Sequence, residues 1–294
     1  MCGIVGLFAK TTDAERRLGA DLSAMFAQLA DRGPDSAGVA VYRDPVASGA
    51  AKLSLLHRAG GTPDWPLLGT VIADRGDQAV VVVDREPADA RAWIADAHPE
   101  LLVLSVGSAI ETAKRVGRPD LLIADTGLAA IAGTHALGHT RMATESRVST
   151  EHSHPFSTGS DLCLVHNGSL SNHNSLRRDL RRRGIAFETD NDSEVAAGYL
   201  SWRLAEGDDL DAALHSALAA LDGFFTFAVG TRDGFAVVRD PIACKPAILA
   251  ETDDWVAMAS EQRGIAVLPG ARDAVFWEPE PARVYSWTRE AVAA

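Results

Sequence analysis

Short apolar runs and one long amphipathic segment alternate at the start of this chain. Ile4 and Val5 lie in a run of β-branched and apolar residues, which predicts a short opening strand. The apolar residues that follow recur at helical spacing and are Leu18, Leu22, Met25, Phe26 and Leu29. We therefore expect an amphipathic helix over about residues 14–30, ended by the glycine- and proline-containing turn at 31–35 and followed by a strand at 37–42.

The pattern changes between about residue 44 and residue 136. Residues 79–83 and 101–104 are continuous apolar runs, typical of buried strands, and each is followed by an alanine-rich stretch of helical character. This pattern predicts either an inserted α/β subdomain over about residues 44–136 or a set of excursions from the main sheet. No repeat or proline- and glycine-rich linker interrupts the chain, so we expect a single domain over residues 2–294 that contains this insert.

The second half of the chain alternates blocks of helices with blocks of strands. A strand at 162–165 is expected to lead into a turn at His166-Asn167-Gly168. Helices are expected at 170–183, 193–205 and 210–221, and strands at 224–229, 235–239, 247–250 and 255–259. Helices grouped in blocks favour a layered α+β fold over a doubly wound parallel sheet.

Composition and charge narrow the function classes. The 294 residues carry a formal net charge of −12, which argues against nucleic acid or an anionic membrane as the main partner. No apolar run approaches the roughly 18 residues that would span a bilayer. The first residues lack the basic flank of a secretory signal, and three cysteines cannot all pair. We therefore expect a cytoplasmic protein without a disulfide framework.

Cys2 is the most informative single residue. Its small side chain would permit removal of Met1, which would place a thiol and a free α-amine on one residue. Because an N-terminal amine titrates near neutrality, it can accept the proton of a neighbouring nucleophile without a separate histidine. A cysteine at this position could also be a small buried residue, so the rest of the chain has to decide between these interpretations.

Four further residue types suit amide hydrolysis. Asn167 and the backbone N–H of Gly168 could donate two hydrogen bonds to an oxyanion. Arg141 could hold a carboxylate through its guanidinium, and Asp192 could pair with an ammonium group. Each residue alone also has an ordinary structural role: Asn-Gly is a common hairpin turn, an aspartate before a helix is a common N-cap, and an arginine on a strand often faces solvent.

Taken together in this order, the motifs resemble the class II, or N-terminal-nucleophile, glutamine amidotransferases. The stretches that carry the resemblance are Met-Cys-Gly-Ile-x-Gly at 1–6, Arg-Gly-Pro-Asp-Ser-x-Gly at 32–38, Gly-His-Thr-Arg-x-Ala-Thr at 138–144, His-Asn-Gly at 166–168 and Asp-Ser-Glu at 192–194. Residues 144–146, 153–157, 165–172 and 239–246 are most similar to the standalone Glx-type, or N-methylglutamate synthase A, subunits of glutamate-synthase-like systems.

The resemblance implies a fold and a set of roles. The fold would be a four-layer αββα sandwich with Cys2 at the edge of a central strand. Cys2 would be the nucleophile and its amine the base, with Asn167 and Gly168 as the oxyanion hole. The remaining implied roles are support of the N-terminus by Arg32 and contacts with L-glutamine by Arg141, Thr144, Asp192 and Gly168.

No metal or cofactor is expected in this chain. Five histidines cluster in sequence (His139, His152, His154, His166 and His173), but none shows a metal-ligand spacing, and no phosphate-binding glycine motif is present. We also expect no synthase domain in this chain, because little sequence follows its last predicted strand. The resemblance therefore implies a hetero-oligomer in which ammonia passes to a separate synthase subunit that contains FMN and iron–sulfur clusters.

Three alternatives stay open at this point. The chain could be a freestanding γ-glutamyl amidohydrolase, which would prefer other γ-glutamyl amides to glutamine. It could be a catalytically silent regulatory subunit that keeps the fold. It could also be a Cys-His hydrolase that pairs Cys2 with His139 or His166 and tolerates an N-terminal extension.

Overall fold

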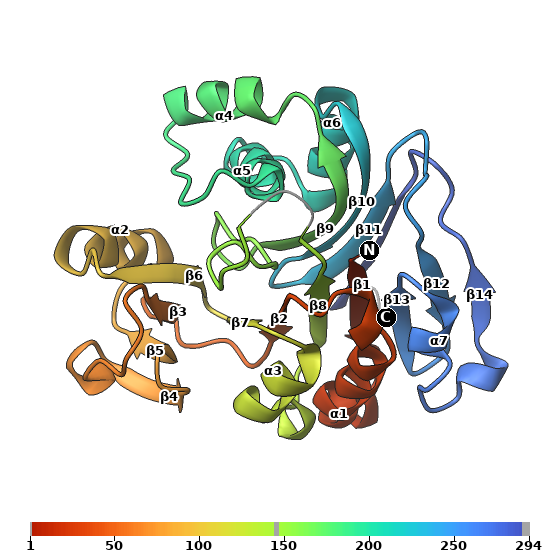
Figure 1. The fold of residues 1–294 in the computed structure, drawn as a ribbon, viewed down its shortest axis with the longest axis horizontal. Helices are drawn as coiled ribbons and strands as arrows, with labels where there is room; N and C mark the ends of the chain where they lie inside the picture. Colours follow the sequence, from red (N-terminus) through yellow and green to blue (C-terminus); the bar gives the residue numbers. More distant parts are fainter. Residues whose placement is uncertain (1, 144–146, 290–294) are drawn as a thin grey trace.

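The computed structural model describes residues 2–143 and 147–289 and places two facing β-sheets between two layers of helices (Figure 1). The larger sheet is antiparallel, in the order β14 (Val275–Trp277), β12 (Ile248–Glu251), β13 (Trp255–Ala259), β1 (Gly3–Ala9), β8 (His135–Arg141), β2 (Ser36–Tyr42) and β7 (Ile110–Val116). The facing sheet is also antiparallel, in the order β15 (Val284–Thr288), β11 (Gly234–Arg239), β10 (Gly223–Gly230) and β9 (Cys163–Leu170).

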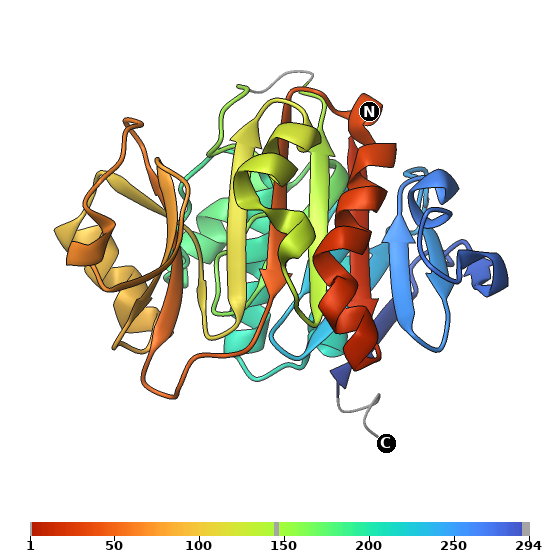
Figure 2. The ribbon, with the colours of Figure 1, turned by 90° about the horizontal axis from the view of Figure 1, so that it is seen from below.

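Helices cover the outer face of each sheet. The larger sheet is covered by α1 (Thr12–Gln28) and α3 (Pro119–Thr126), which lie in front of it in Figure 2. The smaller sheet is covered by α5 (Asp192–Ala205) and α6 (Leu210–Ala220), and α4 (His173–Arg182) packs on α5. The short α7 (Gln262–Ile265) contacts α1. This αββα order confirms the predicted fold class.

The opening strand β1 lies in the middle of the larger sheet and is buried on both faces. Val5 and Leu7 pack in the core under α1, whereas Ile4 and Phe8 point into the core between the two sheets. Because successive side chains of a strand face opposite sides, a strand buried on both faces must be apolar throughout. This explains the uninterrupted apolar run at the start of the chain.

The first helix confirms the periodicity of its sequence. Thr11 caps α1 by accepting a hydrogen bond from the Ala14 backbone N–H over 3.3 Å. Five apolar residues at helical spacing are fully buried against the larger sheet, namely Leu18, Leu22, Met25, Phe26 and Leu29. The apolar stripe therefore determines which face of α1 covers β1.

The middle of the chain divides into two parts. A separate antiparallel sheet, with the order β4 (Thr70–Asp74), β5 (Gln78–Val83), β3 (Ala51–His57) and β6 (Leu101–Gly107), is covered on one face by α2 (Pro87–Ala97). The chain then returns to the larger sheet in β7 and α3. The helix expected directly after residues 101–104 does not begin there. The chain first completes β6 and forms β7, and only then enters α3.

The inserted sheet covers the outer edge of β7, which is the last strand of the larger sheet. The Ser54 hydroxyl accepts a hydrogen bond from the Thr112 N–H over 2.8 Å. The Gln78 amide bonds both backbone groups of Lys114, donating to its carbonyl over 2.6 Å and accepting from its N–H over 3.1 Å. An exposed edge strand would leave these groups as a template for another chain, so the side chains of the insert close the sheet.

The prediction of a turn at residues 166–168 is wrong. β9 continues through these residues, with Asn167 opposite Thr226 and Gly168 opposite Phe225 of β10. Gly168 has a φ of 150°, and a Cβ atom there would lie 2.0 Å from the Phe224 carbonyl oxygen. The glycine therefore permits close approach of two strands rather than a reversal of the chain.

Strands β14 and β15 also lie outside the predicted pattern. Both are partly exposed; β14 has only three residues, and β15 mixes polar with apolar residues, so neither forms the longer apolar run that predicted the other strands. Within residues 2–143 and 147–289, no helix is long and apolar enough to cross a membrane.

Replacing Gln78 tests whether the insert stabilises the edge of β7. Gln78→Ala removes both bonds to Lys114 and leaves two buried backbone groups without partners. Since such groups cost about 1–3 kcal/mol each, we expect the free energy of unfolding in urea to fall by about 2 kcal/mol or more. Gln262→Ala, at an exposed position, is the matched control and should change it by less than about 0.5 kcal/mol. Equal stability of the two variants would contradict the edge-covering role.

Candidate active site

Cys2 lies directly before the central strand β1, next to the end of β8. Gly3 pairs with Thr140, so the residues that follow β8 lie beside the Cys2 side chain. The Met142 backbone N–H is 3.4 Å from the Cys2 Sγ atom, and the Met142 carbonyl oxygen is 3.7 Å from it. Cys2 is only partly buried, which leaves the sulfur within reach of a small molecule.

An arginine holds the backbone of Cys2. Arg32 ends the short 3-10 helix Ala30–Arg32 after α1 and donates a hydrogen bond from Nε to the Cys2 carbonyl oxygen over 2.9 Å. Its Nη1 atom forms an ion pair with Glu261, whose own pKa is held below its ordinary value by this hydrogen bond. The side chain of Arg32 is 9% exposed, so the contact with Cys2 is shielded from bulk water.

Asn167 approaches the same carbonyl from the facing sheet. Its Nδ2 atom donates to the Cys2 carbonyl over 3.2 Å and to the Ser260 hydroxyl over 3.2 Å. Its Oδ1 atom lies 3.3 Å from Nε2 of the His139 ring. An Nε2–H donor on His139 and two acceptors around Nδ2 fix the orientation of the amide, with the N–H groups directed toward Cys2.

The backbone N–H of Gly168 lies on the free edge of β9. The Phe225 residue opposite it directs its own N–H and carbonyl to Asp240, each over 3.0 Å. Residues that face one another in an antiparallel pair either exchange both hydrogen bonds or point both sets of groups away. Gly168 is therefore in a non-hydrogen-bonded pair, and its N–H points away from β10. Because Gly168 is exposed, this donor is accessible to a ligand.

Arg141 ends β8 and lies one residue before Met142, so it is brought close to Cys2. The residue is 5% exposed, and one Nη1 hydrogen bond reaches the Arg147 carbonyl over 3.0 Å. Burial lowers the pKa of Arg141, while the nearby Cys2 and Asp35 side chains act in the opposite direction. Thr144, the other residue assigned to this side of the site, lies outside the described residues.

Asp192 is placed near the end of β9 by the first turn of α5. One carboxylate oxygen accepts from the Leu170 N–H over 2.9 Å, and the other accepts from the Ser193 hydroxyl over 3.3 Å. The helix N-cap is Asn191, whose side chain accepts from the Ser193 N–H, so the capping role considered for Asp192 is taken by its neighbour. The Asp192 side chain retains 23% exposure, which leaves part of the carboxylate accessible.

Three of the clustered histidines form a buried network behind Asn167. The Ser193 hydroxyl lies 2.9 Å from Nε2 of His154 and 2.8 Å from Nδ1 of His166, while the His139 and His154 rings stack at 4.0 Å. Burial lowers the pKa of His139 to about 3 and also lowers the pKa values of His154 and His166. All three rings are therefore neutral at neutral pH.

Neither His139 nor His166 forms a hydrogen bond with the Cys2 thiol. Nε2 of His139 contacts the His166 carbonyl oxygen and the Asn167 side chain instead, and Nδ1 of His166 contacts the Ser193 hydroxyl. The geometry thus gives no support to a Cys-His pair. Among the described residues, no group of three or more histidine, cysteine, aspartate or glutamate side chains is arranged to hold a metal ion.

Sequence reasoning did not identify Ser260 and Glu261. Both follow β13, which pairs with β1, and the Ser260 hydroxyl also accepts a hydrogen bond from the Ile4 N–H over 2.9 Å. These residues are more than 250 positions from Cys2 and lie in no recognisable motif. Only the pairing of β1 with β13 brings them to the site.

Comparison with known proteins shows which family this chain resembles. A glutamine amidotransferase domain model matches residues 139–266. The chain is 50% identical to the glutamine amidotransferase-like protein GlxB of Rhizobium meliloti (strain 1021), over 100% of both chains. It is also 31% identical to a putative glutamine amidotransferase of Methanothermobacter thermautotrophicus, over 97% of this chain and 99% of the relative.

The fold has a counterpart among solved structures. Glutamine phosphoribosylpyrophosphate amidotransferase from B. subtilis superposes with a TM-score of 0.64 at 20% identity, over 98% of this chain. This chain corresponds to 48% of the length of that enzyme, so the likeness concerns the fold of one part of it. With full-length identity of 50% to one amidotransferase-like protein and this shared fold, the chain belongs to the class II, N-terminal-nucleophile family of glutamine amidotransferases.

Proposed function

We propose that this chain is a glutaminase subunit that hydrolyses the side-chain amide of L-glutamine through a thioester on Cys2. The observation that carries this proposal is the convergence of three elements on one residue. Arg32 and Asn167 both donate to the Cys2 carbonyl, and the end of β8 lies against its sulfur. A half-buried thiol held this firmly at the start of a central strand is suited to nucleophilic attack.

The proposed reaction needs only groups at this site. After removal of Met1, the Cys2 amine takes the thiol proton while sulfur attacks the amide carbon of glutamine. Negative charge develops on the amide oxygen and is stabilised by the Gly168 N–H and by Asn167, whose Nδ2 exchanges one present acceptor for that oxygen. The carbon–nitrogen bond then breaks, and the amine returns the proton to the departing ammonia. Water cleaves the γ-glutamyl thioester to give glutamate and regenerates the thiol.

The ends of the substrate would be held by opposite charges. Arg141 would bind the α-carboxylate of glutamine, and Asp192, with Gly168, would bind its α-ammonium group. These two side chains come from different elements: Arg141 ends β8, and Asp192 begins α5 beside the end of β9. A molecule held by both is fixed in length and direction, which selects an amino acid over a simple amide.

The ammonia would be used by a separate subunit rather than released. Ammonia in bulk water is protonated and loses its nucleophilicity, so a protected route favours transfer to an acceptor. The motifs at residues 144–146, 153–157, 165–172 and 239–246, which resemble the standalone subunits of glutamate-synthase-like systems, support a synthase partner, which we propose to contain FMN and iron–sulfur clusters. The working form would then be a cytoplasmic hetero-oligomer.

Intact mass combined with covalent labelling tests the nucleophile. We expect the purified chain to lack Met1 and to gain one adduct from the glutamine analogue 6-diazo-5-oxo-norleucine, located on Cys2 and prevented by excess glutamine. Cys2→Ser should remain unlabelled. Cys244→Ser, which removes an exposed thiol, is the matched control and should label like the unchanged chain. Retention of Met1 without an adduct on Cys2, or labelling of Cys244 alone, would contradict the mechanism.

Paired substrates test the two ends of the glutamine site. Arg141→Lys loses the bidentate geometry, so kcat/KM for glutamine should fall roughly 10- to 100-fold. The slow hydrolysis of 4-aminobutanamide, which lacks the α-carboxylate, should not change in this variant. Asp192→Asn should show the reverse selectivity, with a loss for glutamine but not for glutaramate, which lacks the α-amine. An equal loss for all substrates in either variant would indicate a general structural defect instead.

Activity of the isolated chain tests the coupling to a partner. We expect slow ammonia release from glutamine alone, and a rise in kcat/KM of about tenfold or more when the synthase subunit is added. Full activity without the partner would contradict coupling. A preference for other γ-glutamyl amides over glutamine would identify a freestanding γ-glutamyl amidohydrolase.

A further inference from the structure

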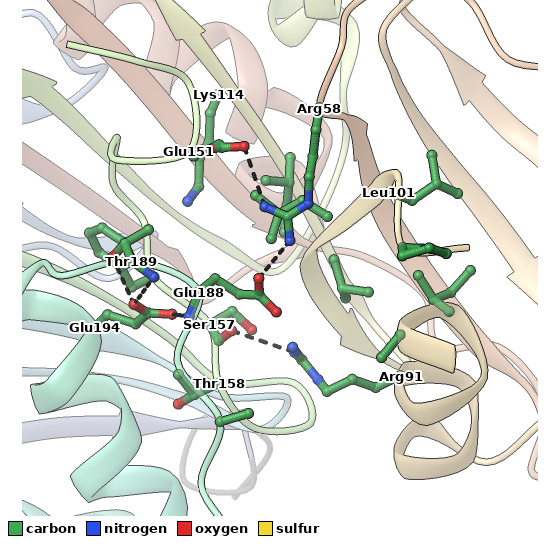
Figure 3. Close-up of a pocket in the computed structure, with 18 residues that line it drawn as sticks. Arg58, Arg91, Leu101, Lys114, Glu151, Ser157, Thr158, Glu188, Thr189 and Glu194 are labelled. Carbon is green, nitrogen blue, oxygen red and sulfur yellow. Dashed lines mark hydrogen bonds and ion pairs between the residues drawn. The ribbon is translucent and has the colours of Figure 1, made fainter. Parts of the chain in front are cut away.

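A cavity lies between the inserted sheet and the main sandwich, away from the Cys2 site. Its volume is about 300 Å³, at the small end of the range for ligand pockets. One wall comes from α2 and β6 of the insert, and the other comes from Lys114 on β7 and from segments 151–158 and 186–194 of the sandwich. Figure 3 shows Lys114 entering the pocket from the sandwich and Arg91 reaching in from α2.

Three cations and three carboxylates line this cavity, but they do not pair one to one. Arg58 forms ion pairs with two of the carboxylates, Glu151 at 3.4 Å and Glu188 at 2.6 Å. The third carboxylate, Glu194, accepts three bonds from the backbone and side chain of the turn at 188–189, all within 2.8 Å. All three negative groups are thus engaged within the protein.

Lys114 and Arg91 have no carboxylate within 4 Å among the described residues. Lys114 is 3% exposed, and its Nζ atom forms no hydrogen bond in the described part of the chain. The Nζ atom lies over the Phe156 ring, 4.7 Å from the ring centroid. Within residues 2–143 and 147–289, Arg91 donates a single long hydrogen bond of 3.4 Å, to the Ser157 carbonyl. Desolvation lowers the pKa of Lys114 to about 8 although Glu194 and Glu151 act in the opposite direction, so these carboxylates, which lie beyond ion-pair distance, offset only part of the cost of burying the ammonium.

The wall opposite Lys114 is apolar. Leu102 and Leu104 point from β6 toward the cavity and form a small cluster separate from the core of the insert under α2. Together with Phe156 they would surround a short hydrocarbon portion of a ligand. Leu102, Leu104 and Phe156 are only 2–4% exposed, so they leave room for no more than a short apolar chain. A small molecule with one acidic end and a short apolar body would contact both walls.

We propose that this cavity is a binding site for a small organic anion, whose carboxylate or phosphoryl group lies between Lys114 and Arg91 and whose apolar part lies against β6. The site is separate from the glutamine site and does not depend on the function proposed for Cys2. Its ligand makes no bond to the protein other than ionic, hydrogen-bonding and apolar contacts.

Calorimetric titration in the absence of glutamine tests the site directly. The probes are butyrate and propylphosphonate, with butyramide as a neutral compound of similar shape. We expect saturable binding of at least one of the anions to one site per chain, and no saturable binding of butyramide. Lys114→Met and Arg91→Gln should each weaken the binding roughly tenfold or more, since each removes one charged hydrogen bond.

Two further variants locate the anion. Arg16→Gln removes an exposed charge on α1 and should leave binding unchanged. Arg141→Gln, in the proposed glutamine site, should also leave it unchanged. Thermal melting of Lys114→Met checks its folding, which should be retained because methionine keeps the length of the side chain. The proposal is overturned if neither anion binds, if folded Lys114→Met and Arg91→Gln bind as tightly as the unchanged chain, or if only Arg141→Gln loses binding.

Discussion

The pairing of β1 between β13 and β8 is the constraint on which the rest of this structure depends. β1 is the central strand of the larger sheet, and both of its faces are buried. Its neighbours come from near the middle and near the end of the chain, so each brings a site segment to Cys2. Met142 follows β8 and lies against the sulfur, while Ser260 follows β13 and bonds both Ile4 and Asn167. The site is therefore assembled from the ends of adjacent strands.

A buried polar network fixes the second sheet against this arrangement. His139, His154 and His166 are neutral because burial lowers their pKa values, and Ser193 links two of them to the start of α5. One nitrogen of each ring has no hydrogen-bond partner among the described residues, which costs stability. Such costs are tolerated where a network holds functional groups in position, and here it orients Asn167 toward Cys2.

The inserted sheet has two distinct relations with the sandwich. Along β7 it supplies polar side chains that satisfy the edge of the larger sheet, including both backbone groups of Lys114. Next to this contact the two units separate around a cavity, into which the side chain of the same lysine extends. The segment 188–194 also contacts both regions, since Glu194 lines the cavity and Asp192 accepts a hydrogen bond from Leu170 at the end of β9. One strand and one turn thus border both the cavity and the site region.

The sequence by itself determined the elements with a clear period and the motifs that identify the family. Apolar spacing predicted α1, and continuous apolar runs predicted β1, β5 and β13, because the spacing of apolar residues follows from whether one or both faces of an element are buried. The tertiary structure alone decided that Asn167 and Gly168 continue β9, since pairing with β10 overrides the local turn preference of Asn-Gly. It also decided the contacts of Ser260 and Glu261, because strand pairing over more than 200 residues has no local signature in the sequence.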